Sequence, residues 1–182
     1  MTISYENALQ LLRKYVEKPT RIHHCIGVSK IAHRIAETIL YNNPGLDIDP
    51  EKVRLAGLLH DIGYGISAQD HELHTMEILK THGLDDIAEI TTHGYLYEHL
   101  LIKGIKREDL LPASIENKII IYADLLFNQR RQTTTMEERI RTTSKLIKDD
   151  PERLAAWSQA IPRFYELKEE LSELRNETRN VQ

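Results

Sequence analysis

Apolar residues recur three or four positions apart along most of the chain, which restricts the fold to helices packed on one another. Between Arg21 and Tyr41, for example, Val28, Ile31 and Ile35 fall on one face at about 100° per residue. No segment alternates apolar and polar residues between hairpin turns, and no internal repeat is present. Because 182 residues suffice to bury one sizeable core, we predict an all-α fold built as a single helical bundle.

Helix breakers divide this pattern into segments. Helices are expected over residues 4–16, 21–41, 50–61, 70–82, 85–92, 114–128, 136–148 and 151–161, with a last helix after a break at Pro162. Thr20 is placed to cap the second of these helices, and Pro50 opens the third. Residues 94–111 are polar and are predicted as a connection of unassigned structure.

Composition limits the class of protein. The net charge of −4 argues against a general nucleic-acid binder, so we expect no duplex nucleic-acid partner. The single cysteine, Cys25, excludes an internal disulfide and a Cys-rich zinc site. The N-terminal residues lack the apolar core of a signal peptide, and no run of 18 apolar residues is present. We therefore expect a cytoplasmic protein without a membrane partner.

The run LLHDIGYG, residues 58–65, ends an apolar segment on two polar side chains, His60 and Asp61. Adjacent residues of a regular helix point about 100° apart, so these two can converge only where the helix ends. Gly63 and Gly65 let the chain turn away at that point. A shared metal ion would offset the burial of both side chains.

Two further polar side chains point toward the interior from other helices. His24 lies on the apolar face of its helix, whereas His23 and His33 lie on other faces. Asp124 is surrounded by apolar residues in KIIIYADLLF, and a buried carboxylate costs several kcal/mol unless it is paired. Taken alone, His24 would be an ordinary core histidine, and Asp124 would be paired with an arginine such as Arg54.

Taken together, two imidazoles and two carboxylates form a mixed nitrogen and oxygen ligand set. Such a set suits Mn, Fe, Ni, Co or Zn better than Ca, with Mg as a further candidate. It leaves coordination positions open for water and substrate. The four predicted ligands are His24, His60, Asp61 and Asp124.

These residues and their flanks resemble the HD-domain superfamily of all-helical, metal-dependent phosphohydrolases. The similar segments are HCIGVSKIA (24–32), RLAGLLHDIGYG (54–65) and ADLLFNQR (123–130). The resemblance covers residues 20–131, which we take as the HD domain. Residues 1–19 then form an N-terminal helix, and residues 132–182 form a C-terminal helical extension packed on the core.

The resemblance implies that the four residues hold a metal ion whose bound water attacks phosphorus. Asp61 would also act as the catalytic base that orients this water. The implied substrate is a nucleotide or another small phosphorylated metabolite, cleaved at a phosphoester or phosphoanhydride bond.

Some relatives bind a second ion through additional histidines. Here His74 in HELHTMEIL and His93 in ITTHGY fit that pattern, as second-metal ligands or substrate contacts. We expect one bound ion, with two as the alternative. The other histidines of this region, His71, His82 and His99, are expected to be solvated.

A phosphorylated substrate also needs cationic or hydrogen-bonding partners. Arg130 and Arg131 follow Asp124 by about two helical turns, and Arg21 precedes the first ligand. Arginine suits bidentate phosphate contacts, although the adjacent pair could simply be solvated. Tyr64 stands where many relatives have a lysine, so it could donate a hydrogen bond to phosphate instead.

Two other functions stay open at the level of sequence. The chain could be a non-catalytic regulatory protein with a structural ion and a ligand pocket, or a di-iron oxygenase. A serine hydrolase is excluded because no G-x-S-x-G motif is present. Cys25 has no identified base that would make it a nucleophile.

An apolar stripe near the C-terminus has two interpretations. It either packs on the chain's own core or forms a homodimer through the C-terminal helix. The stripe consists of Phe164, Leu167, Leu171 and Leu174.

Overall fold

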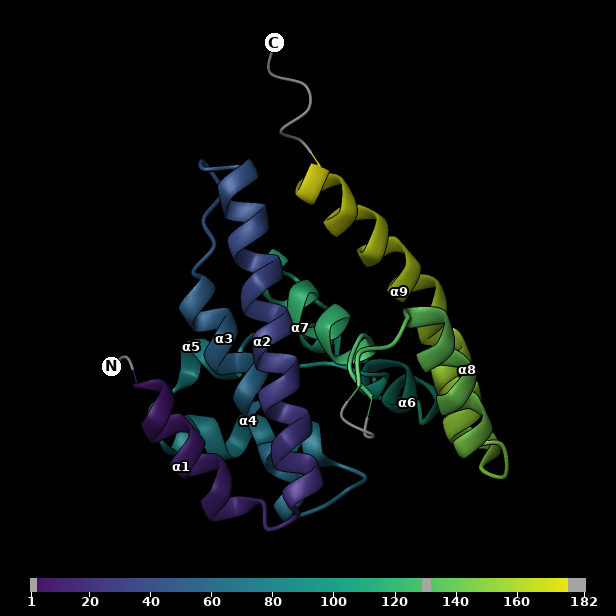
Figure 1. Cartoon of the computed structure of the whole chain (residues 1–182). Helices are drawn as coiled ribbons and strands as arrows, with labels where there is room; N and C mark the ends of the chain where they lie inside the picture. Colours follow the sequence, from purple (N-terminus) through teal and green to yellow (C-terminus); the bar gives the residue numbers. More distant parts are fainter. Residues whose placement is uncertain (1–2, 129–131, 177–182) are drawn as a thin grey trace.

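The computed structural model describes residues 3–128 and 132–176, and its helices are shown in Figure 1. They are α1 Tyr5–Tyr15, α2 Pro19–Asn42, α3 Pro50–Leu59, α4 His71–Thr81, α5 Asp85–Ala88, α6 Leu96–Ile102, α7 Ile115–Leu125, α8 Met136–Leu146 and α9 Pro151–Asn176. Two 3-10 turns, η1 Ile62–Gly65 and η2 Glu108–Leu110, lie between them. Within the described residues there is no β-strand, so the predicted all-α fold is confirmed.

Side-chain caps explain why several helices begin where they do. Ser4, Asp49, Ser114 and Thr135 each accept a hydrogen bond from a backbone N–H in the first turn of the following helix. The predicted cap at Thr20 is wrong. The helix already begins at Pro19, because proline fits the first turn without needing its missing N–H.

Helices α2, α3 and α7 form the centre of the bundle (Figure 1). Helix α2 packs along α3 at close range, since a Cβ on Gly57 would lie 2.9 Å from the Cα of Ser29. The buried residues of these helices form one continuous hydrophobic core. The polar ends of α2, α3 and α7 therefore meet inside a packed interior.

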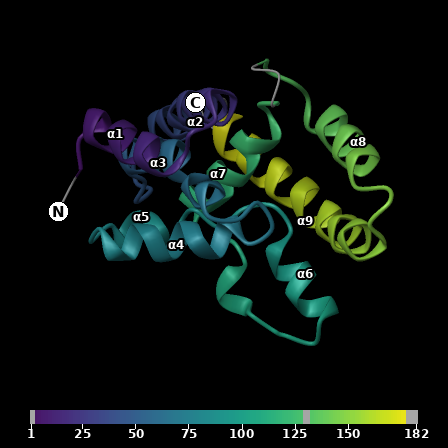
Figure 2. The same ribbon diagram turned by 90° about the horizontal axis from the view of Figure 1, so that it is seen from below.

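The predicted connection over residues 94–111 contains helix α6 and the turn η2. Both project from the body of the bundle, as Figure 2 shows. The helix expected over residues 85–92 is shorter than predicted, since α5 ends at Ala88. The residues that follow it form an irregular segment, with turns at residues 89–90 and 94–95, that carries His93 and leads to α6.

The C-terminal helix does not break at Pro162, contrary to the prediction. Helix α9 runs through this proline, which costs about 3 kcal/mol in a helix interior. Burial of Trp157, Phe164, Leu167 and Leu171 on either side offsets that cost, at roughly 1.5–3 kcal/mol for each large apolar side chain. The sequence shows the helix-breaking proline, but it does not show the surface against which the helix packs.

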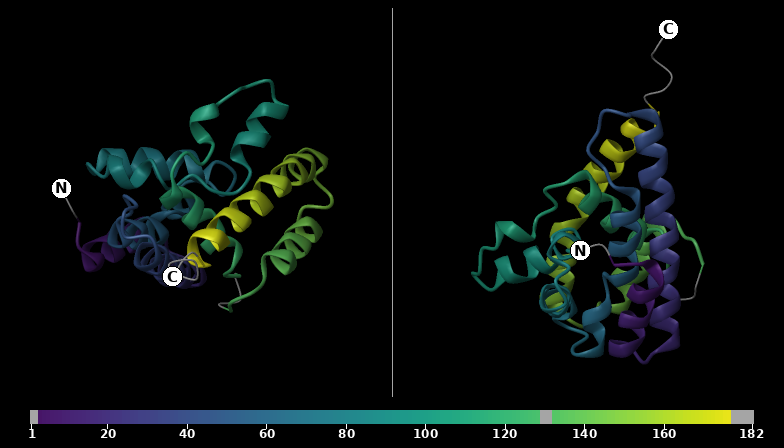
Figure 3. Two further views of the ribbon diagram at one scale, coloured as in Figure 1. Left: turned by 90° about the horizontal axis from the view of Figure 1, so that it is seen from above. Right: turned by 90° about the vertical axis from the view of Figure 1, so that its left-hand side faces the viewer.

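Helix α9 packs against α2, α6 and α7, and α8 lies beside it on the outside (Figure 3). The apolar stripe of α9 thus faces the chain's own core, with Phe164 and Leu171 fully buried. A homodimer through the C-terminal helix stays a prediction, and this stripe no longer argues for it. Among the described residues, no helix is long and apolar enough to cross a membrane.

Candidate metal centre

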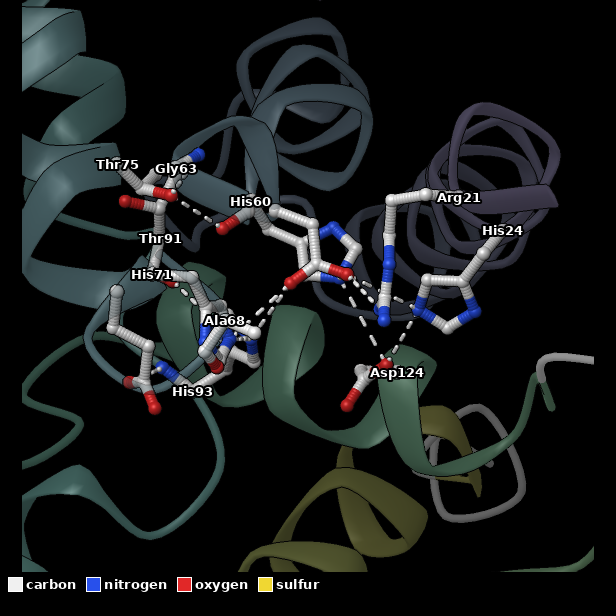
Figure 4. A network of polar contacts seen from close by, with 12 residues as sticks. Arg21, His24, His60, Gly63, Ala68, His71, Thr75, Thr91, His93 and Asp124 are labelled. Carbon is white, nitrogen blue, oxygen red and sulfur yellow. Dashed lines mark hydrogen bonds and ion pairs between the residues drawn. The ribbon is translucent and has the colours of Figure 1, made fainter. Parts of the chain in front are cut away.

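Four side chains from three helices meet at one point of the interior, and Figure 4 labels three of them, His24, His60 and Asp124. His24 projects from α2, His60 and Asp61 lie at the end of α3, and Asp124 lies near the end of α7. The distance from His24 Nε2 to Asp124 Oδ1 is 2.9 Å, and that from His60 Nε2 to the same oxygen is 3.8 Å. The structure therefore brings together all four residues predicted as metal ligands.

The two carboxylate oxygens of Asp61 face different groups. Oδ2 lies 3.4 Å from His60 Nε2 and 3.8 Å from His24 Nε2. Oδ1 lies 3.3 Å from His93 Nε2 and 3.4 Å from His71 Nε2. Asp61 thus stands between two groups of potential ligands, one on each side of its carboxylate.

Several buried atoms of this cluster have no hydrogen-bond partner within the described residues. They are Nδ1 and Nε2 of His24, Nε2 of His60 and Oδ1 of Asp61. An unsatisfied buried polar atom is costly, and native proteins seldom retain several at one point without a ligand. The ligand atoms of His24, His60 and Asp124 lie within 4.8 Å of one another, as do those of His60, Asp61 and His93. The donor set therefore fits a divalent transition metal.

Local contacts fix the orientation of His60. Its Nδ1 lies 2.8 Å from the carbonyl oxygen of Gly57, so Nδ1 carries the proton and Nε2 is left with its lone pair toward the cluster. Thr75 donates to the carbonyl oxygen of His60 at 3.0 Å and accepts from the N–H of Gly63 at 3.0 Å. These contacts tie the end of α3 to helix α4.

Gly63 and Gly65 serve close packing rather than an unusual backbone conformation. A Cβ on Gly63 would lie 2.0 Å from the carbonyl oxygen of His71, and one on Gly65 would lie 1.8 Å from that of Tyr15. Neither glycine has a positive φ. The turn η1 thus needs glycine because two other backbones pass directly over it.

Burial and charge set the protonation of the cluster. Burial lowers the pKa of His60 to about 4, which keeps the ring neutral. Burial alone would also lower the pKa of His93, but Glu72 and Asp61 raise it to about 10. Burial would raise the pKa of Asp61, but His60 and His93 hold it well below its usual range. Asp61 is therefore a carboxylate at neutral pH.

The second group contains His71, which the sequence analysis placed in solvent. That expectation is wrong, because the His71 side chain is only 15% exposed and its Nε2 lies 3.2 Å from that of His93. His74, proposed instead, lies outside the cluster with a 30% exposed side chain beside Glu77. The similarity of HELHTMEIL to HD-domain proteins led to the prediction of His74. In the structure, helix α4 is rotated so that His71, its first residue, faces Asp61 instead.

His93 lies on the segment between α5 and α6. Its backbone N–H donates to Glu72 at 3.0 Å, and its Nδ1 lies 2.9 Å from the carbonyl oxygen of Thr91. Asn117 of α7 donates to the carbonyl oxygens of Ile90 and Thr92 on the same segment. These bonds hold an irregular segment in place, so that the Nε2 of His93 faces Asp61.

Asp124 is balanced by a residue outside the sequence prediction. Arg54, the partner considered from sequence, pairs with Glu51 and stacks on Tyr5 instead. Arg139 of α8 reaches within 3.8 Å of Asp124 Oδ1. Burial alone would raise the pKa of Asp124, but His24 and Arg139 hold it well below its usual range.

A pocket of about 450 Å³ opens over the cluster. Arg21 lines it, donates to Asp61 Oδ2 at 2.6 Å and lies 3.7 Å above the ring of Tyr64. Tyr64 also stacks against His71 and faces the pocket. Arg130 and Arg131, predicted as phosphate contacts, lie outside the described residues.

The chain matches the HD domain family over residues 21–129, and it belongs to this family. The resemblance drawn from the sequence is therefore confirmed. Members of this superfamily are metal-dependent phosphohydrolases, and the present chain has His and Asp groups that could hold a metal. Helices α8 and α9 lie beyond the matched residues.

Three relatives show how widely this sequence recurs. The chain is 31% identical over 182 residues to an uncharacterized protein of Methanocaldococcus jannaschii, covering 94% of this chain and 99% of the relative. It is 27% and 31% identical to tRNA (cytidine(56)-2'-O)-methyltransferases of Thermoplasma volcanium and Picrophilus torridus. These matches cover 82% and 72% of this chain but 44% and 36% of the two methyltransferases. No solved structure matches the chain.

Proposed function

We propose that this protein is a metal-dependent phosphohydrolase that cleaves a phosphoester or phosphoanhydride bond of a nucleotide or other small phosphorylated metabolite. One observation carries the proposal. The Asp61 carboxylate stands between two imidazole groups in a pocket lined by arginines, and several buried ligand atoms there have no hydrogen-bond partner within the described residues. A divalent ion bound there would supply an activated water and polarise a phosphoryl oxygen.

The chain's own residues take distinct roles in this proposal. His24, His60, Asp61 and Asp124 hold the first ion. His71 and His93, with the second oxygen of Asp61, form the group that could hold another. Because Arg21 fixes Asp61 at 2.6 Å, Asp61 is oriented to accept the proton of the attacking water.

Phosphate charge would be met by two arginines, one beside each carboxylate of the centre. Arg21 lies beside Asp61, and Arg139 lies beside Asp124. Both side chains are 15% exposed, so their charges are poorly screened by water. Tyr64 takes the place of the lysine of other relatives as a neutral donor, because burial raises its pKa to about 12.

The names of two relatives suggest which substrates to include. Both are tRNA methyltransferases in which the region matched by this chain is less than half of the protein. Because tRNA is a polyribonucleotide, these names favour a ribonucleotide as the form of the substrate. We include nucleoside 2',3'-cyclic phosphates in the test for this reason.

The test combines metal content with turnover. Untagged protein purified without chelator would be analysed by elemental mass spectrometry, then assayed with added Mn, Fe, Co, Ni, Zn or Mg. The substrates would be p-nitrophenyl phosphate, bis(p-nitrophenyl) phosphate, nucleoside mono- and diphosphates and 2',3'-cyclic phosphates. We expect one or two ions per chain and release of phosphate or nitrophenol.

Other outcomes would select the alternatives. Bound metal without turnover of any phosphoester would favour the non-catalytic regulatory protein. Two iron ions with a visible iron–oxygen absorption would favour the oxygenase. Absence of metal after exposure to all six ions would overturn the metal centre itself.

A further inference from the structure

The pocket continues past the metal centre along α6, which lies inside the HD domain match, and along α8 and α9, which lie beyond it. Its lining includes residues of α6, α8 and the start of α9. The outer subsite is defined here by six of these residues. They are Tyr95, Thr143, Leu146, Ile147, Arg153 and Trp157.

The length of α8 gives the scale of this outer region. Arg139, Thr143 and Ile147 follow one another at four-residue intervals, and all line the pocket. From Arg139 beside Asp124 to Ile147 the helix rises about 12 Å, at 1.5 Å per residue. A bare phosphate at the metal centre would therefore leave the outer subsite empty. The volume of about 450 Å³ falls within the range of small-molecule sites.

Arg153 is placed to contact a ligand in this subsite. Its Nε donates to the hydroxyl of Tyr95 at 2.9 Å, and its backbone N–H is capped by Asp150. Within the described part of the chain, the Arg153 guanidinium has no ion pair and its Nη groups have no hydrogen-bond partner. A guanidinium held at one edge presents its other donors as a fork.

Apolar surface accompanies this guanidinium. Leu146 lines the pocket although it is 78% exposed, and Trp157 and Ile147 line it as well. Isolated exposed leucines are common, but this one lies at the mouth of a pocket with a buried polar floor. The subsite thus offers apolar side chains and a donor fork together.

We infer that the outer subsite binds the nucleoside part of a nucleoside monophosphate whose phosphate lies at the metal centre. This inference rests on the proposed function and names its substrate class. Residues of α8 and α9, together with Tyr95 of the HD domain, therefore determine specificity, and the metal centre of the HD domain supplies the chemistry. Arg153 donates to the acceptor edge of the base, and Leu146 covers one side of it.

Charge at the outer end argues against a second phosphate there. Asp150 and Glu152 line the same region and would repel an anion. Lys103 and His99 are already engaged by Glu152, at 3.0 Å and 2.6 Å. A neutral base with donors and acceptors matches this mixture better than a polyphosphate chain does.

The experiment compares ligands that differ only in the base. Isothermal titration calorimetry on the metal-loaded protein would measure binding of non-hydrolysable phosphonate analogues of the 5'- and 3'-monophosphates of the four ribonucleosides, and of the matching analogue of ribose 5-phosphate. We expect at least one nucleotide to bind about tenfold more tightly than ribose 5-phosphate, the size of one charge-assisted contact. Arg153→Gln and Leu146→Ser should each remove most of this preference.

A matched control lies on the same helix pair. Arg141 is 55% exposed, pairs with Glu138 and does not line the pocket, so Arg141→Gln should leave the preference unchanged. Equal binding of ribose 5-phosphate and all nucleotides, or an unchanged preference in Arg153→Gln, would overturn the inference. Circular dichroism melting would show that each variant is folded.

Binding separates this inference from the proposed function. A preference for nucleotides without any hydrolysis would support the nucleoside-binding subsite and contradict the proposed phosphohydrolase activity. Hydrolysis of ribose 5-phosphate and of nucleotides at equal kcat/KM would support the phosphohydrolase activity and contradict the nucleoside-binding subsite.

Discussion

Neighbouring histidines of this chain lie in sharply different environments. His24 is 1% exposed at the cluster, whereas the adjacent His23 is exposed and bonds to the carbonyl oxygen of Pro19. On α4, His71 faces Asp61 and His74 faces Glu77. Each pair thus contains one histidine that faces the cluster and one that does not. Substituting the second is a matched control for substituting the first.

His24→Ala is expected to abolish metal binding and turnover, because it removes a ligand of the first ion. Loss of a residue that merely supports a ligand already costs about 10- to 100-fold in metal affinity. His23→Ala should change neither property. Elemental mass spectrometry and phosphoester turnover on both variants would check this, and full activity of His24→Ala would reject the ligand assignment.

His71→Ala is expected to lower the metal content from two ions per chain to one. Of the two Asp61 oxygens, His71 faces Oδ1 and not the Oδ2 that faces His24 and His60, so the first group stays complete. His74→Ala should match the unaltered protein. A second ion that survives His71→Ala, or an unaltered protein that never holds two, would contradict the second group.

At the scale of the element, the turn η1 is the part of the fold that places His60 and Asp61. Its position depends on two backbones, those of His71 and Tyr15, passing over Gly63 and Gly65. Thr75 adds side-chain bonds to the same turn. The end of α3 is thus fixed by elements that come before and after it in sequence.

Gly63→Ala is expected to destabilise the protein by about 1–3 kcal/mol or more and to lower metal affinity, because the new Cβ would displace backbone atoms beside the cluster. Gly45→Ala is a suitable control, since a Cβ there meets no atom within 4 Å. Chemical denaturation and metal titration of both variants would check this. Equal stability of the two would show that η1 tolerates a side chain.

At the scale of the whole molecule, α9 is tied to the metal-centre side of the bundle. Arg163 of α9 donates to both carboxylate oxygens of Glu98 at 3.0 Å and to the carbonyl oxygen of Gly94 at 3.2 Å. Gly94 follows His93 directly and has a φ of 63°, which glycine adopts without strain. The C-terminal helix thus helps to hold the segment that carries His93.

Arg163→Met is expected to destabilise the protein by about 3–5 kcal/mol, because it leaves the Glu98 carboxylate buried without a partner. Adding Glu98→Leu should restore much of the loss. Lys168→Met, which breaks an exposed pair with Glu137, should have little effect. Urea denaturation would measure the free energy of unfolding of each variant. An unchanged value for Arg163→Met would show that the Arg163–Glu98 pair does not hold α9 in place.

Removal of metal should also act on the whole molecule. An ion that binds only the folded state adds about 2.7 kcal/mol when free metal is 100 times its Kd, which corresponds to roughly 5–10 °C in Tm for a chain of this size. We expect a chelator to lower Tm by that amount and re-addition of metal to restore it. If chelator leaves the Tm of the metal-containing protein unchanged, the bound metal does not stabilise the fold.

The sequence by itself determined the fold class and the meeting of His24, His60, Asp61 and Asp124. Helical periodicity is local, so polar side chains on apolar faces can be recognised without knowing their partners. Their role as metal ligands stays a prediction. Only the tertiary structure decided that His71 and not His74 faces Asp61, that Arg139 and Arg153 line the pocket, and that α9 continues through Pro162. Each of these depends on how one helix is rotated and packed against another that is distant in sequence, and no local pattern encodes that packing.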